Sequence, residues 1–203
     1  MRVIGTLAAV LFRLLVALLP GAWLRWLITQ WYPLKIITGR SNYEPYLYRW
    51  ALRKRPDGGH DYLHFFVRGD DDEALHSHPW TGHSTILAWG YREERRVPMK
   101  MTGDAVPMEY WWDWNWLDVM LKRNKAVEAG KRTGHIVLSR SFRFLDDNTL
   151  EAETFHRVDL LHPKKGCWTL FRTGPFEKPW AFWVRDTGET VPHRAYITRK
   201  KSL

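Results

Sequence analysis

Most of the chain, from residue 46 onward, consists of short hydrophobic segments separated by turn-forming residues such as Pro56-Asp57-Gly58-Gly59. Many short strands with turns between them and few helical periods are typical of an all-β sandwich or barrel. We therefore predict a mainly β domain. The predicted strands cover residues 46–52, 62–68, 75–80, 84–89, 91–101, 135–144, 151–161, 167–172 and 180–185, with 135–144 and 151–161 paired around the turn Asp146-Asp147-Asn148.

The N-terminal segment has a different pattern. Residues 3–19 are almost all apolar, interrupted mainly by Thr6 and Arg13, and Pro20-Gly21 ends the run. Residues 22–31 continue it with aromatic side chains. Basic side chains at the lipid phosphates and Trp rings at the headgroups are typical of interfacial anchors. The residues that fit this description are Arg2, Arg13, Arg25, Trp23, Trp26 and Trp31.

We expect residues 1–40 to form a helical segment that associates with a membrane surface, on its cytoplasmic face. Three alternatives stay open. Arg13 within the run and the lack of a small-x-small cleavage site argue against a secretory signal peptide. A single spanning helix requires Arg13 to extend toward the interface. The helices could also pack on the barrel or on another subunit.

The composition suggests two units and an insertion. Gly39-Arg40-Ser41-Asn42 marks a joint between residues 1–40 and the β-domain, residues 41–203. Near residues 109–130 the strand rhythm breaks, and this stretch carries Trp111, Trp112, Trp114 and Trp116. Such an insertion could be a lid, a partner surface or a cap on one end of the barrel.

The charge and the cysteine content limit the classes of partner and of chemistry that the chain can have. The 203 residues carry a formal net charge of +9, with one denser basic patch at Arg49, Arg53, Lys54 and Arg55 and another at residues 199–201. No nucleic-acid-binding signature accompanies this charge, so nucleic acid is not expected as a partner. Cys167 is the single cysteine, which makes an intrachain disulfide impossible. Its apolar neighbours predict a buried residue and not a nucleophile.

The candidate chemistry lies in the histidines. His76 and His78 are two residues apart in a predicted strand, and side chains at that spacing point to the same face. His83 follows a bend at residues 79–82 and could return to the same place. Neutral imidazole is a common ligand for Fe, Cu, Zn and Ni. These residues predict a divalent metal site within a barrel.

The same residues resemble the first motif of the cupin superfamily, which runs Gly, His-x-His, a Glu, and a second Gly. Here the order is Gly69, His76-Ser77-His78, His83 and Gly90, with His83 at the glutamate position and the first glycine one residue too distant. The second cupin motif centres on one histidine, and His156 is the match. The usual proline, glycine and asparagine around it are replaced by Glu151, Glu153 and Leu160.

A group of small uncharacterised cupin-like proteins with a His-x-His-Pro-Trp motif is similar over about residues 43–185. Residues 76–80, 167–175 and 180–183 carry this likeness. The resemblance implies a double-stranded β-helix, a jelly-roll barrel, with the metal inside its mouth. It implies His76, His78, His83 and His156 as metal ligands and a homodimer by analogy. Fe(II) is the preferred metal, with Zn, Mn and Ni as alternatives.

Several other residues are candidates for supporting roles. His64 is held in reserve as a ligand on the neighbouring strand, whereas His60, His135, His162 and His193 are expected to be ordinary histidines. No catalytic residue is assigned, because a general acid or base needs hydrogen-bond reach to the substrate. The acid–base candidates are Tyr91, Glu93, Glu94 and Glu153, and the candidates for binding an anionic substrate are Arg157, Arg172 and Lys178.

The leading functional hypothesis is a metal-dependent cupin enzyme, an Fe(II) oxygenase acting on a small or membrane-proximal organic substrate. A metal held by neutral imidazoles keeps its full charge, which favours an anionic substrate group. The absence of a His-x-Asp/Glu pair at the first motif argues against a 2-oxoglutarate oxygenase. The alternatives are a non-catalytic membrane-attached module for ligand binding or interaction, and a cupin isomerase or epimerase.

Overall fold

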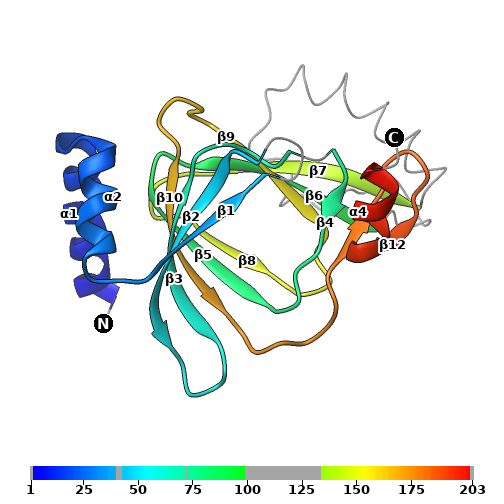
Figure 1. Cartoon of the computed structure of the whole chain (residues 1–203), viewed down its shortest axis with the longest axis horizontal. Coiled ribbons are helices and arrows are strands. Elements are labelled where there is room, and N and C mark those ends of the chain that lie inside the picture. Colours follow the sequence, from blue (N-terminus) through cyan, green and yellow to red (C-terminus); the bar gives the residue numbers. More distant parts are fainter. Residues whose placement is uncertain (1, 40–42, 72, 99–133, 202–203) are drawn as a thin grey trace.

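Two antiparallel β-sheets face each other in the computed structural model, which describes residues 2–39, 43–71, 73–98 and 134–201 (Figure 1). The insertion predicted near residues 109–130 lies outside the described residues. The strands are β1 (Leu34–Thr38), β2 (Pro45–Lys54), β3 (His60–Phe66), β4 (Leu75–His76), β5 (Gly82–Ala88), β6 (Tyr91–Pro98), β7 (His135–Phe142), β8 (Asp147–Leu150), β9 (His156–Leu160), β10 (Cys167–Thr173), β11 (Ala181–Trp183) and β12 (Thr190–Pro192). The helices are α1 (Arg2–Leu18), α2 (Gly21–Thr29) and α4 (His193–Lys201).

The strand order is that of a jelly roll. Sheet A has the order β1-β2-β3-β10-β5-β8, and sheet B has the order β12-β11-β4-β9-β6-β7. The eight strands from β3 to β10 divide four and four, and each hydrogen-bonds antiparallel to its neighbours. This arrangement closes most sheet edges by wrapping one chain through both layers. The predicted fold class, a mainly β jelly-roll barrel with an N-terminal helical segment, is confirmed.

The space between the sheets holds a core built from both of them. Ile86, Tyr91, Phe142, Val158 and Cys167 pack together there. Cys167 is fully buried, and burial raises the pKa of its thiol to about 12. It is therefore the buried apolar residue that the sequence predicts, because a thiol that stays protonated is a poor nucleophile.

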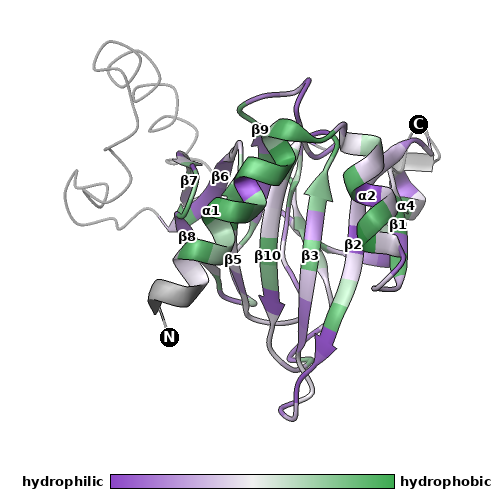
Figure 2. Ribbon diagram, turned by 90° about the vertical axis from the view of Figure 1, so that its left-hand side faces the viewer, coloured by the Kyte–Doolittle hydropathy of each residue, from purple (hydrophilic) through white to green (hydrophobic). Residues whose placement is uncertain are grey.

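The N-terminal helices pack on the outer face of sheet A. Figure 2 shows α1 lying across β5 and β10 and α2 beside β2, with hydrophobic residues along both helices. Trp50 and Trp168 stack with ring centroids 5.5 Å apart beneath the helices, and Leu24 of α2 joins their cluster. The Trp50 indole N–H also donates a hydrogen bond of 3.0 Å to the hydroxyl of Thr29. The two helices therefore pack on the barrel.

Two basic side chains of these helices, those of Arg13 and Arg25, contact aromatic rings. The guanidinium of Arg13 lies 4.3 Å from the centroid of the Phe144 ring. That of Arg25 lies 5.2 Å from the Tyr48 ring and 5.3 Å from the Phe65 ring. Both arginines therefore contact aromatic rings of the barrel. Within the described part of the chain, no helix combines the length and the apolar character needed to cross a membrane.

Several segments differ from the predicted elements. Residues 34–38, assigned to the helical segment, form β1 and pair with β2. The expected turn at residues 146–148 instead begins β8, which pairs with β5 in sheet A, while β9 starts only at His156. The strand predicted over residues 75–80 ends at His76, because the chain leaves sheet B at this point. Neither β12 nor α4 is among the predicted elements.

Candidate metal centre

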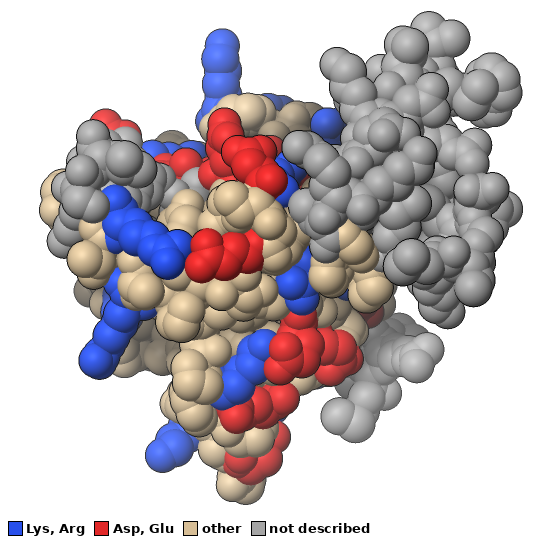
Figure 3. Space-filling view, turned by 90° about the vertical axis from the view of Figure 1, so that its right-hand side faces the viewer, with Lys and Arg blue, Asp and Glu red and all other residues tan. Residues whose placement is uncertain are grey.

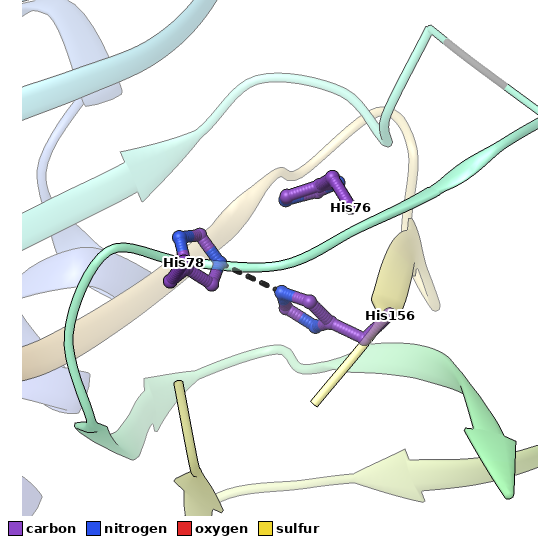
Figure 4. A group of neighbouring side chains, drawn as sticks. All are labelled: His76, His78 and His156. Atoms are coloured by element: carbon purple, nitrogen blue, oxygen red, sulfur yellow. Dashed lines mark hydrogen bonds between the residues drawn. The ribbon is translucent and has the colours of Figure 1, made fainter. Parts of the chain in front are cut away.

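Three histidines from two parts of sheet B meet in the interior. His76 ends β4 and is in register with His156, the first residue of β9. His78 lies two residues beyond β4, and its ring turns back toward the other two (Figure 4). The ring centroids are 4.8 Å apart for His76 and His156, 4.9 Å for His78 and His156, and 5.0 Å for His76 and His78. The sequence predicts that His76 and His78 share one strand face. In the structure β4 ends at His76, and a bend after it brings the His78 ring back toward His76.

Two of the three ring nitrogens stand at a spacing that suits a metal ion. One nitrogen of each ring lies within 4.8 Å of a nitrogen of the other two. The Nε2 atoms of His78 and His156 are 2.8 Å apart (Figure 4). A metal–nitrogen distance of about 2.1 Å and a right angle between two ligands place their nitrogens about 3 Å apart. The two rings therefore already stand at the separation of neighbouring ligands.

A buried carboxylate orients His156. Glu93 of β6 is 1% exposed, and its Oε1 lies 2.5 Å from Nδ1 of His156. Burial by itself would raise the pKa of Glu93, but His156 and Arg95 hold that pKa below its usual value. The ionised carboxylate accepts a hydrogen bond from Nδ1–H, which leaves the lone pair of His156 on Nε2, facing His78. A carboxylate behind a ligating histidine is a recurring feature of metal sites.

Glu93 is itself held by residues from both sheets. Its Oε2 accepts hydrogen bonds from Nε of Arg95, at 2.7 Å, and from the amide of Asn148, at 3.0 Å. Asn148 belongs to β8 of sheet A and is buried, so this contact crosses the interior. Arg95 also donates to the side chain of Asn148 and to the carbonyl of Thr149. The network leaves Glu93 little freedom to move away from His156.

A second carboxylate lies behind His76. The Oδ2 atom of Asp70 is 3.9 Å from Nδ1 of His76, too far for a direct hydrogen bond. Burial raises the pKa of Asp70, and the Tyr46 hydroxyl and the Val158 amide donate hydrogen bonds to its carboxylate at 2.6 and 2.7 Å. Asp70 was not singled out from the sequence, where it is one of four consecutive acidic residues in a predicted turn.

His78 is neutral and lies between aromatic rings. Burial, and then the proximity of His156 and His76, holds the pKa of His78 well below its usual value. Its ring stacks on Trp80 with centroids 4.5 Å apart, and Trp180 stacks more distantly at 6.4 Å. Trp80 is the Trp of the His-x-His-Pro-Trp motif, so the motif places an aromatic surface against one of its own histidines. A neutral ring is the form that binds a metal.

His83, the fourth predicted ligand, lies away from this cluster. It is exposed on β5, and its Nδ1 is 3.1 Å from the hydroxyl of Thr149. Side chains alternate along a strand, and Leu87 on the same face as His83 packs under the N-terminal helices. The histidine therefore points out of the barrel. His64, held in reserve, is buried but is not part of the three-histidine cluster, and neither are His60, His135, His162 and His193.

The acid–base and anion-binding candidates are placed as follows. Glu93 supports His156, and burial raises the pKa of the Tyr91 hydroxyl, so it stays protonated. The remaining five form ion pairs: Glu94 with Arg185 and Arg157, Glu153 with Lys178, and Arg172 with Asp61. Acidic and basic side chains are also interspersed on the molecular face drawn in Figure 3. None of the three predicted anion binders, Arg157, Arg172 and Lys178, is thus without an acidic partner.

Comparisons with known proteins give only distant likenesses. No protein-family model matches the chain, and no curated protein matches it. Among solved structures, the chain is similar to Fe(II)-bound HppE, with 10% identity and a TM-score of 0.41 over 70% of this chain and 56% of that one. HEPD from Streptomyces albus, with 2-hydroxyethylphosphonate and Fe(II) bound, gives 7% and 0.41 over 71% and 24%. KdgF from Halomonas sp. gives 14% and 0.35 over 66% and 85%.

The chain thus spans about half of the length of HppE and about a quarter of HEPD. At these TM-scores the likenesses assign neither a family nor a reaction to this chain. What its own coordinates define is a jelly-roll barrel with three clustered histidines and a buried carboxylate behind one of them. This is the fold that the resemblance to the cupin superfamily implies.

Proposed function

We propose that His76, His78 and His156 bind one divalent metal ion and that the protein is a metal-dependent enzyme of the cupin type. The observation that carries this proposal is the convergence of three imidazoles, one of which is oriented by the buried carboxylate of Glu93. The Nε2 atoms of two of these rings, those of His78 and His156, are 2.8 Å apart. Without a metal one ring donates a hydrogen bond to the other, whereas a bound metal would engage the lone pairs of both nitrogens.

The donor set narrows the choice of metal without deciding it. Three neutral imidazoles suit Fe, Zn and Ni, and Mn is also compatible with such a site. We propose Fe(II), and we propose that the chemistry is an oxygenase reaction on a small organic substrate. When bound, Fe(II) would supply one-electron and dioxygen chemistry next to a site with no charged ligand. The aromatic rings around His78 would hold the organic part of the substrate and exclude water.

Metal removal should lower the thermal stability of the protein. A ligand present at 100 times its Kd stabilises the folded state by about 2.7 kcal/mol. For a chain of this size that corresponds to about 5–10 °C in Tm. We expect a chelator to lower the Tm by this amount and stoichiometric metal to restore it, measured by calorimetry. A Tm that does not respond to either treatment would contradict a metal site in the native fold.

Dioxygen consumption distinguishes the proposed enzyme from its alternatives. Elemental analysis of freshly purified protein should give about one metal ion per chain. An oxygenase loaded with Fe(II) then consumes dioxygen when its substrate is added, whereas an isomerase or epimerase does not. Protein that is folded but contains no stoichiometric metal would favour the non-catalytic binding module.

A second part of the proposal concerns the outer face of the N-terminal helices. Phe12, Val16 and Ile28 pack toward sheet A, yet the opposite side of the same helices is also apolar. Surface helices of soluble proteins usually present polar residues there. The exposed side chains include Leu7, Leu11, Leu14, Leu18, Trp23, Trp26 and Trp31, with exposed fractions from 52% to 82%.

We propose that this apolar helix face rests on a lipid surface and associates the protein with a membrane. Several exposed Trp side chains favour lipid over another protein copy, because Trp partitions to the headgroup region. Figure 1 places α1 and α2 on one side of the molecule and α4 on the other. A protein lying on its helices would keep sheet B away from the lipid.

Vesicle flotation tests this membrane contact. The triple variant Leu11→Gln, Leu14→Gln and Leu18→Gln should lose about 10-fold or more in partitioning, because each substitution removes a buried leucine from the lipid interface. The control variant carries Leu145→Gln and Phe176→Gln, which replace exposed apolar residues outside the helices. It should float like the parent protein. A parent that does not float, or that dimerises through this face in light scattering, would contradict the proposal.

A further inference from the structure

A row of polar side chains crosses the inner face of sheet A. Arg49 of β2 is in register with His64 of β3, which is in register with Thr169 of β10. The residues beside them in sequence, such as Trp50, Phe65 and Trp168, pack under the N-terminal helices on the outer face. Because side chains alternate along a strand, the row of Arg49, His64 and Thr169 faces the interior. It stands opposite the sheet that carries the metal ligands.

Two atoms of this row are buried without a hydrogen-bond partner in the described structure. Nε of Arg49 donates to Nε2 of His64 at 3.0 Å, so the proton of the neutral His64 ring sits on Nδ1. That Nδ1–H has no acceptor, and the hydroxyl of Thr169 has no partner either. His64 is 3% exposed and Thr169 is fully buried. Buried polar groups are nearly always paired, so two unpaired donors in one row indicate a missing acceptor.

Arg49 has no carboxylate partner among the described residues. Arg157, Arg172 and Arg185 each face a carboxylate, whereas no ion pair involves Arg49 among the described residues. Its guanidinium lies 4.9 Å from the centroid of the Tyr62 ring. Burial lowers the pKa of Arg49, which still leaves the group charged at neutral pH. A partly buried positive charge without a carboxylate would be stabilised by an anion that binds from outside.

The row lies close to the metal centre. His64 stacks on Phe171 with centroids 5.0 Å apart, Phe171 contacts Trp80 at 5.2 Å, and Trp80 stacks on His78 at 4.5 Å. The charge of Arg49 also acts, after burial, to lower the pKa of both His64 and His78. A small molecule bound at the row therefore has its other end near the three histidines.

We infer that Arg49, His64 and Thr169 form the binding site for the oxyanion head group, a carboxylate or a phosphonate, of the substrate. Arg49 donates a charge-assisted hydrogen bond, and Nδ1–H of His64 and the hydroxyl of Thr169 donate the others. This inference rests on the proposed function, because it assigns an organic acid as the substrate class of the proposed metal centre. The site fixes one end of the acid on sheet A and presents the rest to sheet B.

The test measures binding of small acids to the full-length Zn(II)-loaded protein by ligand-observed NMR. Acetate and methylphosphonate carry the head group, and acetamide is the uncharged analogue of acetate. We expect acetate or methylphosphonate to bind about 10-fold or more tightly than acetamide, and Arg49→Gln to weaken the acid by a similar factor. The better of the two acids identifies the head group. Arg92→Gln, the same substitution at an exposed position on β6, should change nothing.

A second variant tests the inference even if Arg49→Gln does not fold. Thr169→Val removes a hydroxyl that has no partner within the described structure, so the fold should tolerate it. It should weaken the acid about 3- to 10-fold, the worth of one hydrogen bond. Equal affinity for acids and acetamide, or unchanged acid affinity in both variants, would overturn the inference. Zinc content is measured on the same samples. If the parent protein binds no zinc, the proposed function fails; if it binds zinc but does not prefer acids, only this inference fails.

Discussion

His78→Ala and His156→Ala should each abolish stoichiometric metal binding. A metal held by three imidazoles loses a third of its protein ligands in either variant, and Ala offers nothing in place of the ring. Nε2 of His78 and Nε2 of His156 are 2.8 Å apart, so each ring faces the same point in the site. Elemental analysis after dialysis should give less than about 0.1 metal ion per chain in either variant, against about one in the parent.

His83→Ala is the matched control for this experiment. His83 is exposed on β5 and points away from the three-histidine cluster, so its removal should leave the metal content unchanged. The control also tests the two ligand sets against each other. The motif places His83 at a ligand position, whereas the structure places it away from the other three histidines. Full metal content in His78→Ala and His156→Ala, or metal lost from His83→Ala alone, would refute the site.

Glu93→Gln should weaken metal binding by about 10- to 100-fold, the effect of losing an outer carboxylate behind a ligating histidine. Gln is close to Glu in size but removes the charge that stabilises the Nδ1–H of His156. The substitution also leaves Arg95 without its carboxylate partner at 2.7 Å, and a broken buried pair typically costs about 3–5 kcal/mol. Competition with a chelator of known affinity measures the first effect, and urea unfolding measures the second.

Glu94→Gln provides the comparison for Glu93→Gln. The adjacent carboxylate faces the other side of β6, where it pairs with Arg185 and Arg157. We expect its replacement to leave metal affinity unchanged and to cost less than about 1 kcal/mol of stability, as for other partly exposed pairs. Equal metal affinities in the two variants would show that Glu93 is structural only. Rescue of affinity by Glu93→Asp would support a role for the charge.

The fold was largely predictable from the sequence because strand alternation and turn residues are local signals. The expected strands at residues 46–52, 84–89 and 167–172 all lie within or close to observed ones. The prediction for residues 146–161 was wrong because the polar residues at its start are typical of a turn, whereas Asp147–Leu150 forms a strand that pairs with β5. Pairing between distant strands compensates for weak local preference, and a single sequence does not reveal it.

The candidate site was predictable only in part. Strand spacing put His76 and His78 together, and the resemblance to the cupin motifs added His156, which joins them, and His83, which does not. The bend at residues 79–82 sets the strand parity of His83, and one residue more or less in such a bend reverses the face. The row of Arg49, His64 and Thr169 depends on the register of three strands, which no local sequence motif predicts.

Anomalous diffraction from a crystal grown with the bound metal tests the central claim most directly. At the absorption edge of the metal, the difference map should show one peak within about 2.0–2.2 Å of a ring nitrogen of each of His76, His78 and His156. Nε2 should be the contacting atom of His156, because Glu93 holds its Nδ1. A peak at His83 or elsewhere on the surface, with none between the three rings, would contradict the account.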